Sequence, residues 1–204
     1  MNRLAAPKAR RWIAVGLAFL AVAAPALAET AVSPAPSAAA CPALLNHSYP
    51  RLQDEAPQNL CQFAGQVVLV VNTASYCGYT HQYEGLEALF ARYGKRGLVV
   101  LGFPSNDFGQ QEPGSANQIA DLCFNTYGVR FPMFSKVAVT GPLRTPMYEQ
   151  LFKATQVAPG WNFHKYLIAR DGRTVQSFPS AMEPNSREIT SAIEAALNRH
   201  GQRK

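Results

Sequence analysis

Cys77 is the side chain whose type and position most clearly predict chemistry in this 204-residue chain. It follows residues 66–71, an apolar and β-branched run that is typical of a strand buried on both faces, and it precedes a helical pattern. Unpaired amide groups and the positive end of a helix dipole favour an anion at a helix entrance. Because the thiolate is the nucleophilic form of cysteine, we expect Cys77 to be a reactive thiol, with a structural loop cysteine as the alternative.

The sequence around Cys77 restricts the kind of nucleophile it can be. Residues 77–80 read Cys-Gly-Tyr-Thr, so there is no Cys-x-x-Cys dithiol motif at this position. A cysteine protease needs a placed histidine and an orienting Asn or Asp, and none of the four histidines lies in a local signature of that kind. The pattern indicates a single nucleophilic cysteine that is assisted by groups other than histidine.

The elements around Cys77 predict an α/β fold. Residues 66–71 and 98–103 read as two buried strands, and the helical pattern between them ends at Gly94, so the unit is β-α-β with parallel strands. The later predicted elements are a helix with a capping box at Ser115 and Gln118, a strand at 131–139, a helix from Pro146, a hairpin of residues 163–168 and 174–178 around Asp171-Gly172, and a helix capped by Asn185. This order predicts a mixed central sheet with helices on both faces.

The N-terminal region predicts export. Residues 1–28 have a basic start, an apolar run and the small-x-small motif Ala26-Leu27-Ala28, which together are typical of a cleavable signal peptide. An uncleaved anchor is the alternative, and Arg10-Arg11 leaves both Sec and twin-arginine export open. Residues 29–40 predict a flexible spacer, and residues 41–204 predict a single domain. We therefore expect an exported, periplasmic protein.

The charge distribution argues against nucleic-acid binding. The formal net charge is +6, but four of the 19 lysines and arginines lie in residues 1–28, where there is no acidic residue. The rest of the chain has 15 basic and 13 acidic residues and therefore no strong positive field. A hydrophobic fraction of 48% with 16% charged residues excludes wholesale disorder.

Three blocks of sequence, in the correct order, resemble one known family. They are Asn-Thr-Ala-Ser-Tyr-Cys-Gly-Tyr-Thr at 72–80, Phe-Pro-Ser-Asn-Asp-Phe-Gly-Gln-Gln-Glu-Pro-Gly at 103–114, and Trp-Asn-Phe at 161–163. Together they resemble the glutathione peroxidase family over about residues 60–196. The resemblance implies a thioredoxin-like fold and an antioxidant oxidoreductase that reduces hydroperoxides with thiols and without a metal or other cofactor.

The resemblance also implies a catalytic tetrad of Cys77, Gln111, Trp161 and Asn162. Amide and indole N–H groups are neutral donors that can stabilise a thiolate and orient a peroxide. Taken singly, Trp161 could be an ordinary core or surface aromatic residue, and the two amides could be loop caps. The three blocks in order favour the catalytic interpretation.

Cys123 is the candidate resolving cysteine, since a sulfenic acid at Cys77 must condense with a thiol to escape over-oxidation. Its spacing and following sequence resemble relatives that form an intramolecular disulfide. The alternative is a small buried hydrophobe that shares a helix face with Ile119. If Cys123 resolves, its helix must shift or unwind, because a disulfide needs Cα atoms within about 7 Å. A thioredoxin-like donor, with glutathione as the other option, would then recycle the enzyme.

Cys41 and Cys61 both precede the first predicted buried strand, and export permits disulfides. We predict a structural Cys41–Cys61 bridge that holds the N-terminal segment, with two unrelated thiols as the alternative. The segment between the Pro146 helix and Trp161 is short and lacks the extra loop that tetrameric relatives use, so we expect a monomer.

The sequence predicts a peroxidase that reduces hydrogen peroxide and organic or lipid hydroperoxides. The alternative is a redox relay, in which Cys77 senses peroxide and passes the oxidation to a client protein. A non-catalytic binding module is the third possibility, and the intact tetrad argues against it. The expected partners are the hydroperoxide and a thioredoxin-like reductant, with no nucleic acid and no stable membrane insertion after signal cleavage.

Overall fold

A four-stranded mixed sheet forms the centre of the computed structural model, which describes residues 41–199. The strand order is β4 (Leu98–Pro104), β3 (Val67–Thr73), β5 (Lys165–Ile168) and β6 (Val175–Phe178). Strands β3 and β4 are parallel, while β5 is antiparallel to both β3 and β6. The parallel pair and the hairpin agree with the sequence prediction. The predicted signal peptide (1–28) and spacer (29–40) lie outside the described residues.

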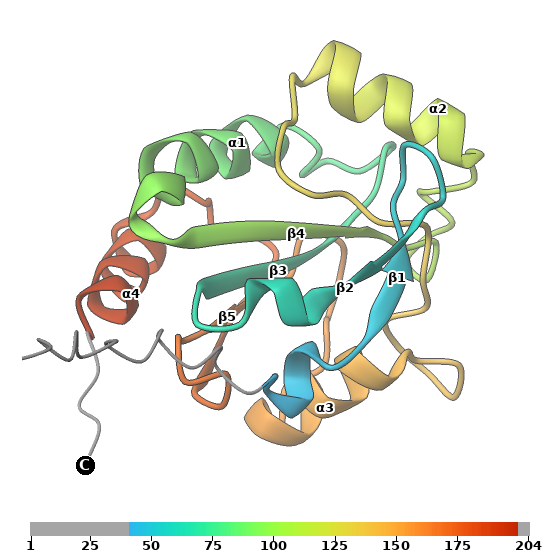
Figure 1. The fold of residues 1–204 in the computed structure, drawn as a ribbon. Helices are drawn as coiled ribbons and strands as arrows, with labels where there is room; N and C mark the ends of the chain where they lie inside the picture. Colours follow the sequence, from blue (N-terminus) through green and yellow to red (C-terminus); the bar gives the residue numbers. More distant parts are fainter. Residues whose placement is uncertain (1–40, 200–204) are drawn as a thin grey trace, which may run out of the picture. The chain divides into compact units, whose positions relative to one another are not determined.

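Alternation along β3 divides the core between the two faces of the sheet. Val67, Leu69 and Val71 belong to the core cluster that includes α1 (Gln82–Tyr93) and α4 (Arg187–Asn198). The even-numbered residues Val68 and Val70 pack in the other cluster, with α3 (Pro146–Thr155). Figure 1 shows α1 and α3 on opposite sides of the sheet. The predicted coverage of both faces is therefore confirmed.

The helix ends follow the capping signals closely. Helix α1 ends at Gly94 and continues as the short 3-10 turn η3 (Gly94–Arg96). Thr145 precedes α3, with Pro146 in its first turn. The prediction that Asn185 caps the last helix is wrong by one residue. Ser186 is the N-cap, because its hydroxyl oxygen accepts a hydrogen bond from the Ile189 amide at 3.3 Å.

The prediction of a strand at 131–139 is also wrong. This segment makes only isolated bridges, Gly102 with Met133 and Arg51 with Phe134, among the residues described. Pro132 has no N–H group and cannot donate to a ladder. Its carbonyl still accepts a hydrogen bond from the Gly102 amide at 2.9 Å. The segment therefore lies extended beside β4 without forming a fifth strand of the sheet.

The N-terminal part of the domain contains elements that the sequence did not indicate. Strands β1 (Ser48–Pro50) and β2 (Pro57–Asn59) form a small antiparallel sheet of their own. The 3-10 turns η1 (Ala43–Leu45) and η2 (Leu60–Phe63) flank it. Leu44, Leu45 and Leu60 pack in the core cluster of α3. The segment thus covers one face of the central sheet.

Helix α2 (Ala116–Ala120) continues directly into η4 (Asp121–Thr126), which is π-helical. The predicted capping box is present at its start, with Ser115 and Gln118 bonded to each other's backbone amides. π-helical turns are rare in proteins, and those that occur often lie at functional sites. Among residues 41–199, no helix is both long enough and apolar enough to cross a membrane.

Candidate active site

Cys77 lies in the turn that joins β3 to α1, as the sequence predicts, and its side chain is half-buried. The Thr80 hydroxyl oxygen accepts a hydrogen bond from the Cys77 amide at 3.1 Å and donates one to the Ala74 carbonyl at 3.0 Å. Cys77 Sγ accepts a hydrogen bond from the Tyr79 backbone amide at 3.4 Å. A backbone donor in the turn before α1 therefore faces the sulfur.

The second sequence block is fixed against this turn through Gln111. Its backbone carbonyl accepts a hydrogen bond from the Tyr76 amide at 3.0 Å. Its side-chain Oε1 accepts one from Asn162 Nδ2, also at 3.0 Å. Gln111 therefore links the residue that precedes Cys77 to the third block. With Oε1 occupied as an acceptor, the amide NH₂ group is the end of Gln111 that can donate to another ligand.

The third block is held at the end of β3 by Asn72. Asn72 Nδ2 donates to the Trp161 carbonyl at 3.1 Å, and the Asn72 carbonyl accepts from the Phe163 amide at 2.6 Å. Asn162 is fully buried, whereas Trp161 is 39% exposed and packs against Phe108 at a centroid distance of 5.6 Å. The structure thus brings the segments carrying the four candidate tetrad residues to one end of β3.

Several buried polar atoms at this end of the sheet have no hydrogen-bond partner among the described residues. They include Asn72 Oδ1, Thr73 Oγ1, Ser75 Oγ, Asn162 Oδ1 and both carboxylate oxygens of Glu112. Burial raises the pKa of Glu112, which is the residue after Gln111 in the chain. Unsatisfied buried polar groups are costly and typical of functional sites. The sequence did not single out Glu112, because nothing in its spacing reveals that its side chain is buried.

Cys123 lies in the π-helical turn η4 and is fully buried. Its Sγ donates a hydrogen bond to the Tyr83 hydroxyl at 3.3 Å. Burial raises the pKa of the Cys123 thiol to about 12. Cys77 and Cys123 are both free thiols here, and Cys77 packs against the core cluster that contains Cys123. In this conformation Cys123 is therefore a protonated core residue, which agrees with the alternative that it is a small buried hydrophobic side chain.

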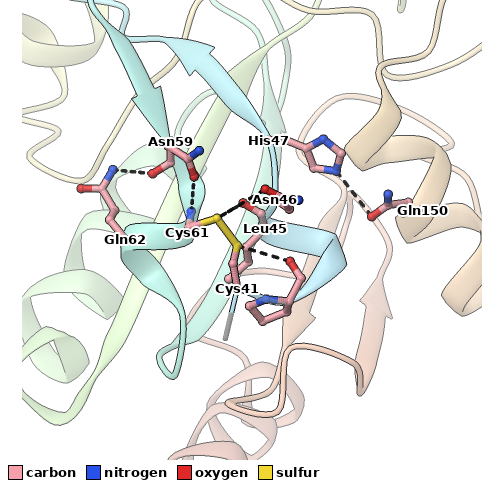
Figure 2. The surroundings of a disulfide bond; sticks show 9 residues. Cys41, Leu45, Asn46, His47, Asn59, Cys61, Gln62 and Gln150 are labelled. Atoms are coloured by element: carbon pink, nitrogen blue, oxygen red, sulfur yellow. Dashed lines mark hydrogen bonds between the residues drawn. A yellow bond between two sulfur atoms is a disulfide. The ribbon is translucent and has the colours of Figure 1, made fainter. Parts of the chain in front are cut away.

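Cys41 and Cys61 form a disulfide, which is the predicted pairing. Figure 2 shows it between the start of the domain and η2. Asn59 Oδ1 accepts a hydrogen bond from the Cys61 amide at 2.8 Å, and His47 Nε2 lies 3.4 Å from Gln150 Oε1 on α3. The bridge thus holds the N-terminal segment against the rest of the domain and belongs to the scaffold.

Residues 41–199 contain no group of three or more histidine, cysteine, aspartate or glutamate side chains that could hold a metal ion. Strand order β4-β3-β5-β6, helices on both faces and a cysteine at the entrance of the helix after β3 define a thioredoxin-like protein.

Comparison with known proteins gives the family within this class. The glutathione peroxidase family model matches residues 46–152. A hydroperoxy fatty acid reductase of Synechocystis is 45% identical over 157 residues, which cover 71% of this chain and 90% of that protein. The thioredoxin/glutathione peroxidase BtuE of Escherichia coli is 42% identical, with coverage of 67% and 87%. The chain belongs to the glutathione peroxidase family and is a thiol-dependent peroxidase.

The solved structures agree with this assignment. A crystal structure titled Trgpx in apo form matches with a TM-score of 0.61 and 34% identity, and the match covers 76% of this chain and 96% of that one. The fold and family that the sequence resemblance implied are therefore confirmed.

Proposed function

We propose that the protein reduces hydrogen peroxide and organic hydroperoxides with Cys77 as the attacking nucleophile. The observation that carries this proposal is the position of Cys77. Its sulfur accepts a hydrogen bond from the Tyr79 amide at 3.4 Å, and the amide of the preceding residue, Tyr76, donates a hydrogen bond to the Gln111 carbonyl. The thiolate attacks the terminal peroxide oxygen, an S–O bond forms and the O–O bond breaks. The departing oxygen takes up a proton and leaves as an alcohol or water, and Cys77 becomes a sulfenic acid.

Gln111, Trp161 and Asn162 are the proposed donors around this step. They carry no charge, so they need not be desolvated as ions when the site is dry. Their hydrogen bonds would be strongest to the negative charge that moves from sulfur to the departing oxygen. The link between Asn162 and Gln111 at 3.0 Å supports a joint role, because displacing one amide displaces the other.

Cys123 is the proposed resolving residue. Its thiol sulfur attacks the sulfenic sulfur, a disulfide forms, and the thiol proton leaves with the hydroxyl group as water. The buried position of Cys123 means that η4 must open before this step. A π-helical turn supports such a role, since its hydrogen bonding differs from that of the preceding α-helix and it is a place where the helix can rearrange.

A dithiol reductant of the thioredoxin type is the proposed electron donor, with glutathione as the other candidate. Two successive thiol attacks on the Cys77–Cys123 disulfide restore both thiols and leave the donor oxidised. The name of the Escherichia coli relative, which includes both thioredoxin and glutathione, supports testing the two side by side.

The function is tested by NADPH-coupled turnover of the full chain without any client protein. The wild type should consume hydrogen peroxide continuously with thioredoxin and thioredoxin reductase, and Cys77→Ser should not. Equal consumption by the two proteins would overturn the role of Cys77. Consumption by the wild type that stops without a client protein would favour the redox relay instead.

Export to an oxidising compartment is part of the proposal. It is supported by the signal-like sequence of residues 1–28 and by the Cys41–Cys61 disulfide, because structural disulfides persist outside reducing compartments. Cell fractionation and the N-terminal mass of the mature protein test the proposed export.

We also propose that the protein is a monomer, because the segment between α3 and Trp161 is short. Light scattering in solution tests this oligomeric state.

A further inference from the structure

A groove of about 560 Å³ opens beside Trp161. Tyr79, whose amide donates to Cys77 Sγ at 3.4 Å, also lines this groove. The groove therefore shares a wall with one proposed catalytic donor and with the residue that contacts the nucleophile. Its volume lies within the range of about 300–1,000 Å³ that is usual for small-molecule sites.

The lining of the groove is mostly apolar, and it contains no lysine, arginine, aspartate or glutamate. Val157 and Ala158, from the segment after α3, face it from one wall, and Pro179 and Ala181, from the segment after β6, face it from another. His164 is the only histidine among the lining residues, and burial lowers the pKa of its imidazole to about 4. The groove thus has no charged side chain at neutral pH to pair with a carboxylate or an ammonium group.

Two residues of β5 hold the walls in place. Buried Lys165 donates hydrogen bonds to the Ser180 carbonyl at 3.1 Å and the Met182 carbonyl at 2.6 Å. The neighbouring Tyr166 hydroxyl donates to the Val157 carbonyl at 2.7 Å. Because both walls are fixed to the central sheet through buried donors, the groove is preformed rather than made by loose loops.

We propose that this groove binds the apolar tail of an organic hydroperoxide while the peroxide group lies at Cys77. On this proposal Val157 and Ala181 determine the preference for long-chain hydroperoxides over hydrogen peroxide. The uncharged lining favours a hydrocarbon tail over a charged thiol reductant such as glutathione, whose carboxylates would find no partner there. The inference rests on the proposed function and adds the site that holds the organic part of the substrate and the residues that select it.

The test compares kcat/KM for hydrogen peroxide with kcat/KM for the hydroperoxide of a long-chain fatty acid methyl ester, which has no charge of its own. Val157→Asp and Ala181→Asp each place a carboxylate in the groove at exposed positions, where folding should tolerate it. We expect each to lower kcat/KM for the ester about tenfold or more and to change the value for hydrogen peroxide less than twofold. Val157→Leu should retain the wild-type preference.

Leu143→Asp is the matched control, because Leu143 is 81% exposed and does not line the groove. It should leave both substrates unchanged. Equal losses for both substrates with the groove variants, or no loss for either, would overturn the inference. The inference would also be overturned if the groove variants raised the KM for the thiol reductant and left kcat/KM for the ester unchanged, because the groove would then bind the reductant. Failure of the proposed function would give a different result, because the wild type would then not turn over hydrogen peroxide.

Discussion

Asn162 Nδ2 donates a hydrogen bond to Gln111 Oε1 at 3.0 Å, and this contact joins two blocks that lie 51 residues apart in the chain. Asn162 is fully buried, and Gln111 is in turn bonded through its carbonyl to the amide of Tyr76, next to Cys77. The position of one amide is therefore tied to that of the other. The two residues should behave as a unit in catalysis rather than as independent donors.

We predict that Gln111→Ala and Asn162→Ala each lower kcat/KM for hydrogen peroxide roughly 10- to 100-fold, which is what the loss of one hydrogen bond to a charged group costs. The double variant should lose less than the product of the two single losses, because each single change already displaces the partner. Steady-state kinetics of the four proteins measure this. Asn117→Ala, at an exposed position on α2, is the control, and strictly multiplicative losses would show that the pair is uncoupled.

We predict that Cys123→Ser abolishes turnover with thioredoxin and leaves one stoichiometric burst of peroxide reduction. Serine keeps the size of the buried side chain and its donor toward Tyr83, so the fold should be retained. What it removes is the thiol that condenses with the sulfenic acid. Stopped-flow measurement of peroxide consumed per protein tests this, and continued turnover with thioredoxin would assign Cys123 a purely structural role.

The stability of the reduced protein should depend on pH through Cys123. Its pKa is about 12 in the folded protein and about 8.5 in an unfolded chain, so the unfolded chain loses the proton first as the pH rises. The stability that the protonated thiol contributes is complete below about pH 8.5 and is lost as the pH rises toward 12, with a slope of up to about 1.4 kcal/mol per pH unit.

Cys123→Ser lacks this titration while every other group stays in place. The free energy of unfolding of the wild type minus that of the variant should therefore fall between about pH 8.5 and 10.5. Urea denaturation of both reduced proteins at several pH values measures the difference. A difference that stays constant with pH would mean that Cys123 is not buried in solution as it is here.

The Cys41–Cys61 disulfide should contribute stability without contributing to turnover. It closes a loop of 20 residues and secures η1 and η2 against the core cluster of α3. The double variant Cys41→Ser with Cys61→Ser should lose about 3 kcal/mol of unfolding free energy and keep the wild-type kcat/KM. Chemical denaturation and peroxide kinetics on the same samples test both parts, and a large drop in activity at unchanged stability would contradict the structural role.

The parts of the fold that the sequence predicted are those with a strong local signal. Strands β3 and β4 are continuous apolar runs, and Gly94 and Pro146 mark helix ends by their backbone chemistry alone. The stretch at 131–139 has the apolar residues of a strand, but Pro132 prevents a continuous ladder beside β4. Strands β1 and β2 were missed because each has only three residues and pairs only with the other.

The candidate site shows the same division. Cys77 could be placed from its local position between a strand and a helix, and the other three tetrad residues came from the family resemblance. The burial of Glu112 and the hydrogen bond between Asn162 and Gln111 depend on how distant segments meet at the end of β3. The donor to Cys77 Sγ is the amide of Tyr79, two residues further on, and its direction depends on the exact shape of this turn. The burial of Cys123 could be foreseen only as an alternative, because its helix face accommodates both a core residue and a reactive thiol.

In the proposed mechanism, the peroxide oxidises Cys77 directly. The most direct test is to pulse reduced Cys123→Ser with one equivalent of hydrogen peroxide in the presence of a sulfenic-acid-specific reagent, and to locate the label by peptide mass spectrometry. We predict near-stoichiometric label on Cys77. Peroxide consumption without label or disulfide at Cys77 would contradict the account.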